Sequence, residues 1–219
     1  IYSDYGLFTS DKRLTCEVER VFDNLEGKID APNFEHLLVA QFNMRKTFLN
    51  LIDNEINNAK EDKKASIIIK LNSLEDEKMI RKLYEASQKG VKISIIVRGI
   101  CSLIPGIKKM STNIEAISIV DRFLEHARVF IFHNCGNEKI YLSSADWMRR
   151  NLSRRIEVAF PLYNENLKKE IKKEIKLQLK DNTKARIIDK NQINEYKKPD
   201  GNSIFRSQYD IYEYLKSKN

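Results

Sequence analysis

Two short runs of apolar, β-branched residues on either side of a helical segment constrain the fold of this 219-residue chain most strongly. Residues 65–71 (Ala-Ser-Ile-Ile-Ile-Lys-Leu) and 91–97 (Val-Lys-Ile-Ser-Ile-Ile-Val) are typical of buried strands. Residues 73–90, between them, repeat apolar side chains at helical spacing and end on a glycine. A strand, a helix and a strand within about thirty residues form a βαβ unit, which leaves the two strands parallel. Ligands of such sheets bind beyond the carboxyl ends of the strands, where Arg98 lies in this chain.

The rest of the chain continues this alternation of helices and strands. Apolar periodicity predicts helices over residues 10–25, 44–60, 164–180 and 204–215. Short apolar runs predict strands over residues 114–120, 126–132, 139–143 and 155–162, and an edge strand or an extended arm over 184–189. Ser10 is the expected N-cap of the first helix, and the last helix is expected to bury Tyr209, Tyr212 and Leu215 in part. We therefore predict an α/β fold with a mixed sheet flanked by helices, and residues 197–202 as its linker.

Composition narrows the class of protein. The sequence has no run of eighteen apolar residues and no signal-like start, so we expect neither export nor a membrane anchor. Cys16, Cys101 and Cys135 lack the spacing of a zinc site or a disulfide framework, which fits a reducing compartment. We expect a cytoplasmic protein and leave association with a membrane surface open. The net charge of +8 favours a polyanionic partner, although the lysines of residues 166–176 would also suit a solvated helix face.

One predicted hairpin carries the residues with the clearest chemical meaning. Side chains two residues apart on a strand share a face, so His126 and Arg128 are expected to point the same way. Arginine binds phosphate oxygens with a fixed fork of donors, while histidine serves as acid, base or nucleophile near neutral pH. Ser143, Ser144 and Asp146 follow on the neighbouring strand, where they could help to hold a phosphate. Spacing alone leaves open a structural alternative, in which the histidine is an ordinary hairpin residue and the arginine a solvated charge.

Further positive side chains favour phosphate chemistry. Arg98 follows a predicted strand, and a cluster after Trp147 comprises Arg149, Arg150, Arg154 and Arg155. Phosphoryl transfer demands mainly positioning and positive charge, because negative charge spreads over the oxygens of the transferred group. The Gly-rich loops that usually cradle ATP are absent, so side chains would have to hold a nucleotide. His36 and His133 show no metal-ligand spacing, and the absence of a nucleophile elbow argues against a serine hydrolase.

These motifs resemble those of known phosphoryl-transfer proteins. A His-x-Arg strand followed by a Ser-containing turn is similar to half of a phospholipase D-type active site, in which two such histidines face each other. Nearly end to end, the chain resembles the C-terminal region of bacterial polyphosphate kinases, which are built on that pair. Six ordered blocks carry the resemblance: residues 1–9 (Ile-Tyr-Ser-Asp-Tyr-Gly-Leu-Phe-Thr), 96–106 (Ile-Val-Arg-Gly-Ile-Cys-Ser-Leu-Ile-Pro-Gly), 117–126 (Ile-Ser-Ile-Val-Asp-Arg-Phe-Leu-Glu-His), 141–148 (Tyr-Leu-Ser-Ser-Ala-Asp-Trp-Met), 155–158 (Arg-Ile-Glu-Val) and 184–189 (Lys-Ala-Arg-Ile-Ile-Asp).

The resemblance implies an activity and its cofactors. It implies reversible transfer of the terminal phosphate of ATP to inorganic polyphosphate, with Mg²⁺ and ATP or ADP, through a phosphohistidine. In the family, the phosphorylated histidine lies upstream of the Tyr-x-Asp block with which this chain begins, so we expect it outside this sequence. His126 matches the second histidine of the family, which serves as general acid/base. Tyr2, Arg98 and Arg155 match residues that line the site and contact phosphates.

Three further residues are assigned through the same resemblance. Arg128 takes the place of the lysine in the wider phospholipase D pattern, which keeps the positive charge and changes its geometry. Ser144 and Asp146 are expected to orient the strand of His126 from behind. No residue is assigned as a metal ligand.

The resemblance also implies a division of the chain and a set of missing partners. Residues 1–30 would end the preceding phosphohistidine subdomain, and residues 31–219 would form the C-terminal phospholipase D-like catalytic subdomain. We expect the N-terminal, head and phosphohistidine domains to be missing and the chain alone to be inactive. The full-length enzyme is expected to be a homo-oligomer that binds inorganic polyphosphate and no nucleic acid.

Two alternative functions stay open from the sequence. One is a phospholipase D-like nuclease or phosphodiesterase, assembled as a homodimer around two copies of His126. The other is a non-catalytic basic module, whose binding of polyphosphate or nucleic acid would depend strongly on salt.

Overall fold

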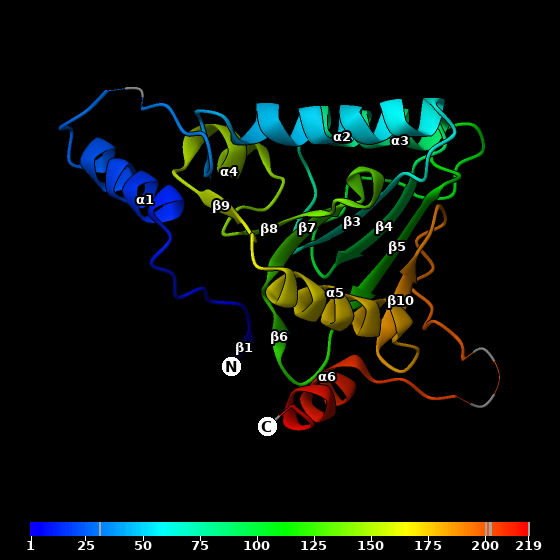
Figure 1. The fold of residues 1–219 in the computed structure, drawn as a ribbon. Helices are drawn as coiled ribbons and strands as arrows, with labels where there is room; N and C mark the ends of the chain where they lie inside the picture. Colours follow the sequence, from blue (N-terminus) through cyan, green and yellow to red (C-terminus); the bar gives the residue numbers. More distant parts are fainter. Residues whose placement is uncertain (31, 200, 202, 219) are drawn as a thin grey trace.

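The computed structural model describes residues 1–30, 32–199, 201 and 203–218. An eight-stranded mixed sheet with helices on both faces forms its centre, and a pair of short strands lies apart from it (Figure 1). The strands are β1 (Tyr2–Ser3), β2 (Leu38–Val39), β3 (Ser66–Leu71), β4 (Lys92–Val97), β5 (Ile114–Ile119), β6 (Leu124–Glu125), β7 (Arg128–Phe132), β8 (Lys139–Ser143), β9 (Val158–Pro161) and β10 (Ala185–Ile188). The helices are α1 (Lys12–Leu25), α2 (Met44–Lys60), α3 (Glu77–Gln88), the short 3-10 helix η1 (Asn134–Gly136), α4 (Arg149–Arg154), α5 (Glu165–Lys180) and α6 (Ser207–Lys216). The predicted α/β fold with a mixed sheet is confirmed.

The strand order places the predicted βαβ unit at the centre of the large sheet. The order is β10-β5-β4-β3-β7-β8-β9-β2. β3, β4 and β5 run parallel, as the crossover through α3 requires, and the remaining neighbours run antiparallel. β7 pairs with β3 so that Val129 lies opposite Lys70. The start of β7 therefore lies beside the end of β3, at one edge of the sheet.

Alternation of side chains along the strands builds an apolar layer on each face of the sheet. α2 and α3 cover one face, where Phe48 and Leu83 belong to one buried cluster with Ile69 (Figure 1). α5 covers the other face, where Ile175 shares a cluster with Val129. These helices cover much of both faces, while the ends of the strands stay accessible (Figure 1).

Trp147 anchors the loop after β8 in this core. Its fully buried ring stacks on Phe130, with centroids 5.0 Å apart and planes 11° apart, and it also meets the ring of Phe48. The carbonyl of Trp147 accepts the amide hydrogens of Glu75 and Asp76, both at 2.8 Å. These contacts hold the loop after β8 in place, including Asp146, which directly precedes Trp147.

The first helix and the predicted strand at Arg155 begin later than expected. Asp11, and not Ser10, caps α1, because its side chain accepts the amide hydrogen of Arg13. β9 begins only at Val158, because the short helix α4, which the sequence analysis did not identify, ends just before Arg155.

The expected burial of the last helix is wrong. Tyr209, Tyr212 and Leu215 are 48%, 61% and 38% exposed, because they lie on the side of α6 that faces solvent, and Ser207 is the one buried residue of this helix. The expected linker, residues 197–202, includes positions outside the described residues.

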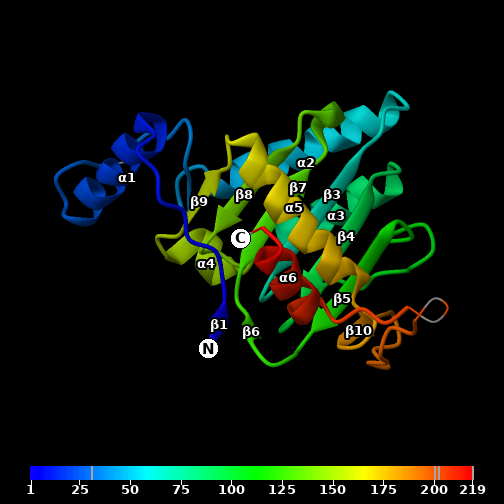
Figure 2. The ribbon, with the colours of Figure 1, turned by 60° about the horizontal axis from the view of Figure 1, so that its bottom comes forward.

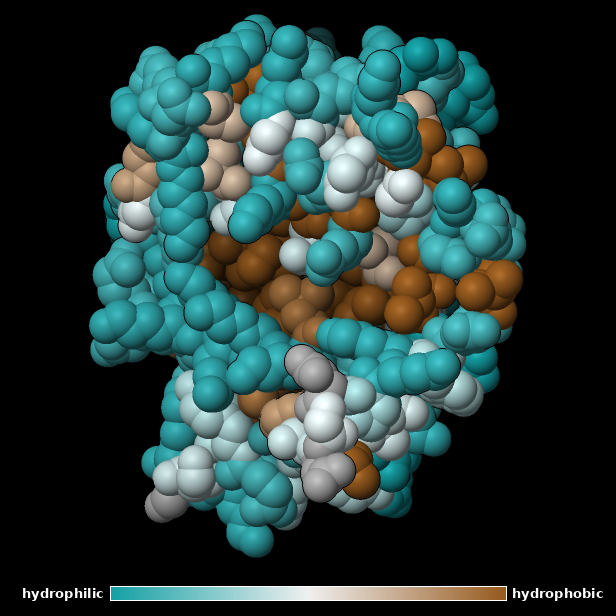
Figure 3. All heavy atoms as spheres, turned by 90° about the vertical axis from the view of Figure 1, so that its right-hand side faces the viewer, coloured by the Kyte–Doolittle hydropathy of each residue, from teal (hydrophilic) through white to brown (hydrophobic). Residues whose placement is uncertain are grey.

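The N-terminal segment runs beside a loop from the middle of the chain. β1 pairs in parallel with β6, so that Tyr2 lies opposite Leu124 and Ser3 opposite Glu125. Figure 2 shows β1 beside β6 and α6 beside α5. On another side of the molecule, residues of β4, β5 and β10 line an apolar hollow of about 460 Å³ (Figure 3). Of the helices that the structure describes, none is both long and apolar enough to cross a lipid bilayer.

Candidate functional site

Polar side chains from separate segments meet at the edge where β3 and β4 end and β7 begins. Asn72 and Arg98 directly follow β3 and β4, and His126 lies two residues before β7. Asp146 comes from the loop after β8, and Asp4 directly follows β1. The carboxyl ends of parallel strands meet at one edge of a sheet, so this convergence follows from the topology. This edge is the candidate active site.

His126 is held by a carboxylate from the far end of the chain. Its Nδ1 lies 2.6 Å from Oδ2 of Asp4, and its amide donates to the carbonyl of Ser3 at 3.0 Å. The ring of Tyr2 meets the imidazole edge to face, with centroids 5.0 Å apart. The side chain of His126 is 33% exposed, so a ligand can reach it. With Asp4 accepting the Nδ1 proton, Nε2 is the nitrogen left to exchange a proton with a ligand.

Arg128 lies between this histidine and a second carboxylate. Its Nε and Nη2 lie 3.3 and 3.2 Å from the two oxygens of Asp146, which forms a bidentate pair. Its Nη1 donates to the carbonyl of His126 at 2.8 Å and lies 3.2 and 3.1 Å from the two ring nitrogens. An atom at nearly equal distance from both nitrogens lies over the face of the imidazole. The structure thus brings His126 and Arg128 together, as their spacing on a strand predicts.

Asp146 connects this pair to the end of β3. Its Oδ1 accepts the amide hydrogens of Asn72 and Ser73, at 2.7 and 3.2 Å. The residue is 7% exposed and is followed by the fully buried Trp147. A buried carboxylate with several donors is fixed in position, so Asp146 can hold Arg128 in one orientation.

Arg98 closes the site on the side of β4. Its Nε donates to the side-chain oxygen of Asn72 and to the carbonyl of Glu125, both at 2.6 Å. Asn72 in turn donates to the carbonyl of His126 at 3.3 Å. Toward the described residues, the terminal nitrogens of Arg98 make no hydrogen bond or ion pair. They can therefore still bind the oxygens of a ligand.

A cavity of about 590 Å³ opens beside His126 and reaches α1. Arg155 and Glu157 line it, with 3.9 Å between the Nη1 of the arginine and the carboxylate. The hydroxyl of Ser144 donates to Glu157 at 2.5 Å and accepts the amide hydrogen of Val158 at 3.1 Å. Ser144 therefore forms its hydrogen bonds with the start of β9 and the residue before it, while Asp146 contacts Arg128 directly.

Glu157 and Asp4 are site residues that the sequence analysis did not single out. Glu157 also accepts a hydrogen bond from the side chain of Asn151, at 2.7 Å, so three side chains converge on its carboxylate. Their positions within the blocks at residues 155–158 and 1–9 are the only sequence signals that point to them.

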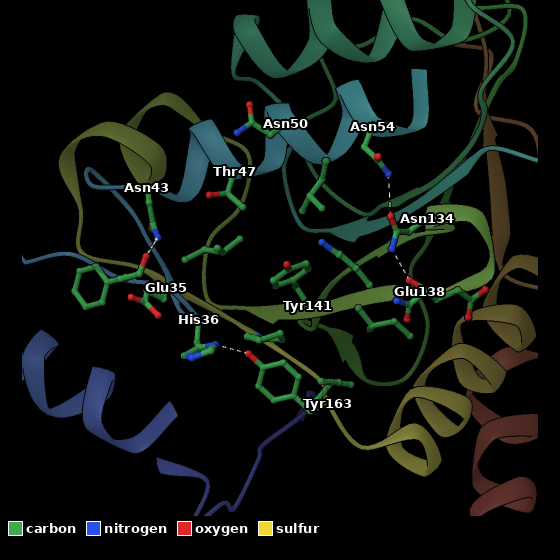
Figure 4. A pocket seen from close by; sticks show the side chains of 18 of the residues that line it. Glu35, His36, Asn43, Thr47, Asn50, Asn54, Asn134, Glu138, Tyr141 and Tyr163 are labelled. Carbon is green, nitrogen blue, oxygen red and sulfur yellow. Dashed lines mark hydrogen bonds between the residues drawn. The ribbon is translucent and has the colours of Figure 1, made fainter. Parts of the chain in front are cut away.

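A larger cavity, of about 750 Å³, lies at the other end of β8, against α2 (Figure 4). It contains His36, whose Nδ1 is hydrogen-bonded to the hydroxyl of Tyr163 at 2.8 Å. The side-chain amide of Asn54 donates to the side-chain oxygen of Asn134 at 2.9 Å. None of its described lining residues is an arginine. Phosphate chemistry needs fixed positive charge near an acid or base, so the smaller cavity at His126 is the better candidate.

Comparison with known proteins identifies the family. Residues 37–208 match the family described as polyphosphate kinase C-terminal domain 2. The chain belongs to the polyphosphate kinase family. It is 48% identical to the polyphosphate kinase of Vibrio cholerae over 217 residues, which cover 99% of this chain and 31% of that protein. The crystal structure of the polyphosphate kinase from Porphyromonas gingivalis matches with a TM-score of 0.93 and 43% identity, over 96% of this chain and 32% of that one.

This member of the polyphosphate kinase family therefore spans about a third of the length of the relatives that it matches. It also shares its fold with a phospholipase D family member, Nuc from Salmonella typhimurium. That match has a TM-score of 0.50 and 16% identity, over 70% of this chain and 97% of the other. The predicted phospholipase D-like sheet is confirmed.

The described carboxylates of this polyphosphate kinase region do not gather into a cluster of metal ligands. Among the described residues, no group of three or more His, Cys, Asp or Glu side chains is placed to hold a metal ion. Asp4, Asp146 and Glu157 each bind a donor from the protein instead. Magnesium in kinases is commonly held by one or two carboxylates together with substrate phosphates, and we assign no described side chain of this chain to it.

Proposed function

We propose that this chain forms the acid/base half of a polyphosphate kinase active site. In the complete enzyme, the terminal phosphate of ATP would pass reversibly to inorganic polyphosphate through a phosphohistidine on another segment. Membership of the polyphosphate kinase family supports this reaction. The observation that carries the proposal is the imidazole of His126, which is oriented by Asp4 and has Arg128 against its face.

His126 is the general acid/base of the proposed reaction. The bond to Asp4 keeps the Nδ1 proton in place, so that Nε2 takes a proton from an attacking phosphate oxygen or gives one to a leaving oxygen. Asp4 stabilises the imidazolium that forms while the proton is held, as a carboxylate does beside a catalytic histidine in other enzymes.

Positive side chains around His126 bind the phosphates. Arg98 offers its terminal nitrogens, and Arg128 adds a charge that Asp146 keeps in position. Arg155 reaches the cavity from the turn before β9, and Tyr2 packs against the imidazole. Several fixed positive groups suit a transition state whose charge is spread over the phosphoryl oxygens.

The nucleophilic histidine belongs, in this proposal, to a segment upstream of Ile1. His36 is bonded to Tyr163 in the other cavity, and His133 lies at the far end of β7 from His126. Neither is therefore placed to accept a phosphate beside His126. We assign residues 1–30 to the preceding phosphohistidine subdomain and residues 31–219 to the catalytic subdomain, which the family match beginning at residue 37 supports. The complete enzyme would be a cytoplasmic homo-oligomer.

Labelling with ATP that carries a radioactive terminal phosphate tests this assignment. The 219-residue chain should acquire no covalent label and make no polyphosphate, because His126 acts on protons only and the nucleophilic histidine lies on another segment. The full-length polypeptide should acquire label and release it to polyphosphate. Acid-labile label on the isolated chain would place the nucleophile within it and overturn the proposal.

A further inference from the structure

A buried polar network links the last helix to the segment that carries His126. Its centre is Glu125, which directly precedes His126 and whose side chain is 3% exposed. The carboxylate forms an ion pair with Lys70 of β3, which is 2% exposed, and accepts hydrogen bonds from Gln178 at 2.9 Å and Gln208 at 2.7 Å. A buried ion pair is weak evidence for stability, because desolvation offsets most of its attraction. Its location is more informative, because the carbonyl of Glu125 also accepts the hydrogen bond from Arg98.

The side-chain amide of Gln208 binds this segment as a neighbouring strand would. Its Oε1 accepts the amide hydrogen of Phe123 at 3.0 Å, and its Nε2 donates to the carbonyl of Phe123 at 2.9 Å. The same Nε2 donates to Glu125. One glutamine of α6 thus satisfies three polar groups of a loop that is 83 residues away in sequence.

The neighbours of Gln208 make similar contacts. Arg206 forms a bidentate pair with Asp121, with distances of 2.6 and 2.9 Å. The amide and hydroxyl of Ser207 both donate to Asp181 at the end of α5, each at 2.7 Å. Ser207 is the one buried residue of α6, and the polar contacts of this first turn attach the helix to the end of α5 and to residues 121–125.

We infer that Gln208 is a positioning residue for the active site. Through Phe123 and Glu125, the first turn of α6 holds residues 121–125 against Lys70 and Gln178. This fixes the backbone from which His126 projects and the carbonyl that orients Arg98. A displacement of about 1 Å in such a site can lower the rate roughly 100-fold. The effect on turnover rests on the proposed function, whereas the effect on the position of His126 does not.

NMR of the 219-residue chain tests the positional part. In Gln208→Ala, the Phe123 amide loses its acceptor, so its hydrogen exchange should become at least about tenfold faster and the imidazole signals of His126 should shift. Gln208→Glu keeps the size of the side chain and replaces its donors by a charge facing Glu125, so it should shift the imidazole signals at least as far. Tyr212→Ala, on the exposed side of the same helix, is the matched control and should change neither. Unchanged exchange at Phe123 in Gln208→Ala, or unchanged imidazole signals in both Gln208 variants, would overturn the inference.

Turnover in the full-length enzyme tests the consequence. Gln208→Ala and Gln208→Glu should lower kcat for polyphosphate synthesis about 10- to 100-fold. Their melting temperatures should stay close to that of the Tyr212→Ala control. A lower melting temperature with unchanged kcat would mean a merely structural role and would overturn the inference. A wild-type enzyme that makes no polyphosphate would refute the proposed function, and the NMR result would still decide the role of Gln208.

Discussion

The imidazole of His126 and the carboxylate of Asp4 lie 2.6 Å apart, although 122 residues separate them along the chain. The parallel pairing of β1 with β6 brings them together, because it places Ser3 opposite Glu125. A carboxylate in this position selects one imidazole tautomer and stabilises the protonated ring during proton transfer. In the proposed reaction, this pair leaves Nε2 of His126 to act as the acid or base.

Replacement of Asp4 by Asn should lower polyphosphate synthesis by the full-length enzyme about 100-fold or more, because the amide cannot hold the same tautomer or stabilise the imidazolium. Initial rates of synthesis from ATP measure the effect. Asp62→Asn, an exposed acidic control in the turn after α2, should stay within about twofold of the wild type. Wild-type turnover in Asp4→Asn would show that the carboxylate only packs against the histidine.

Arg128→Lys should lower kcat about tenfold, because a lysine keeps the charge and loses the fork that binds Asp146. Arg154→Lys, at the exposed end of α4, is the matched control and should have little effect. Steady-state kinetics on both variants measures the difference. Equal turnover in the two variants would mean that charge alone, without the geometry of Arg128, serves the reaction.

Trp147→Ala should lower the free energy of unfolding of the chain by about 3–5 kcal/mol, because it empties a fully buried site between Phe130 and Phe48. Trp147→Phe should cost less, because it keeps an aromatic ring there and the indole Nε1 makes no hydrogen bond to any described residue that could be lost. Urea denaturation measures both changes. A loss below about 1 kcal/mol in the alanine variant would contradict the anchoring role of Trp147.

Glu174 makes stability depend on pH in a predictable direction. Burial raises the pKa of Glu174 above its ordinary value of 4.5, although the hydroxyl of Tyr5 donates to it at 2.7 Å. A carboxyl with a raised pKa in the folded state destabilises the fold as the pH rises above its unfolded pKa, because ionisation is harder in the folded chain.

Glu174→Gln should therefore raise the free energy of unfolding near neutral pH and change it little at a pH well below 4.5, where the glutamate is protonated in both states. Urea denaturation of the wild type and the variant across this range measures the difference. A stabilisation that did not decline toward acid pH would contradict the assignment of the effect to ionisation.

Local sequence patterns predicted the central sheet and one pair of site residues, because those features depend on neighbours in the chain. Buried side chains alternate with less buried ones at the start of residues 66–71 and 92–97, and all side chains are buried toward the end of each run, as in parallel strands. His126 and Arg128 are two residues apart, so one strand period brings them together. Asp146 follows the neighbouring strand, and antiparallel pairing of β7 with β8 brings it to the same edge.

The contacts that orient the site could not be predicted in the same way. Asp4 reaches His126, and Gln208 reaches Glu125, across 122 and 83 residues of chain. Which distant segments pair, and in which register, depends on the packing of the whole domain and not on a local period. The choice between Ser10 and Asp11 as the cap of α1 likewise depended on one side-chain hydrogen bond to Arg13.

The rate of polyphosphate synthesis by the full-length enzyme with His126→Ala tests the central claim most directly. We predict a loss of roughly 100- to 10,000-fold, the range expected for removal of a general acid/base, with an unchanged melting temperature. His36→Ala, which alters the histidine of the other cavity, should keep nearly the wild-type rate. A His126→Ala enzyme that turned over at a near-normal rate would contradict the claim that this histidine performs the acid/base step.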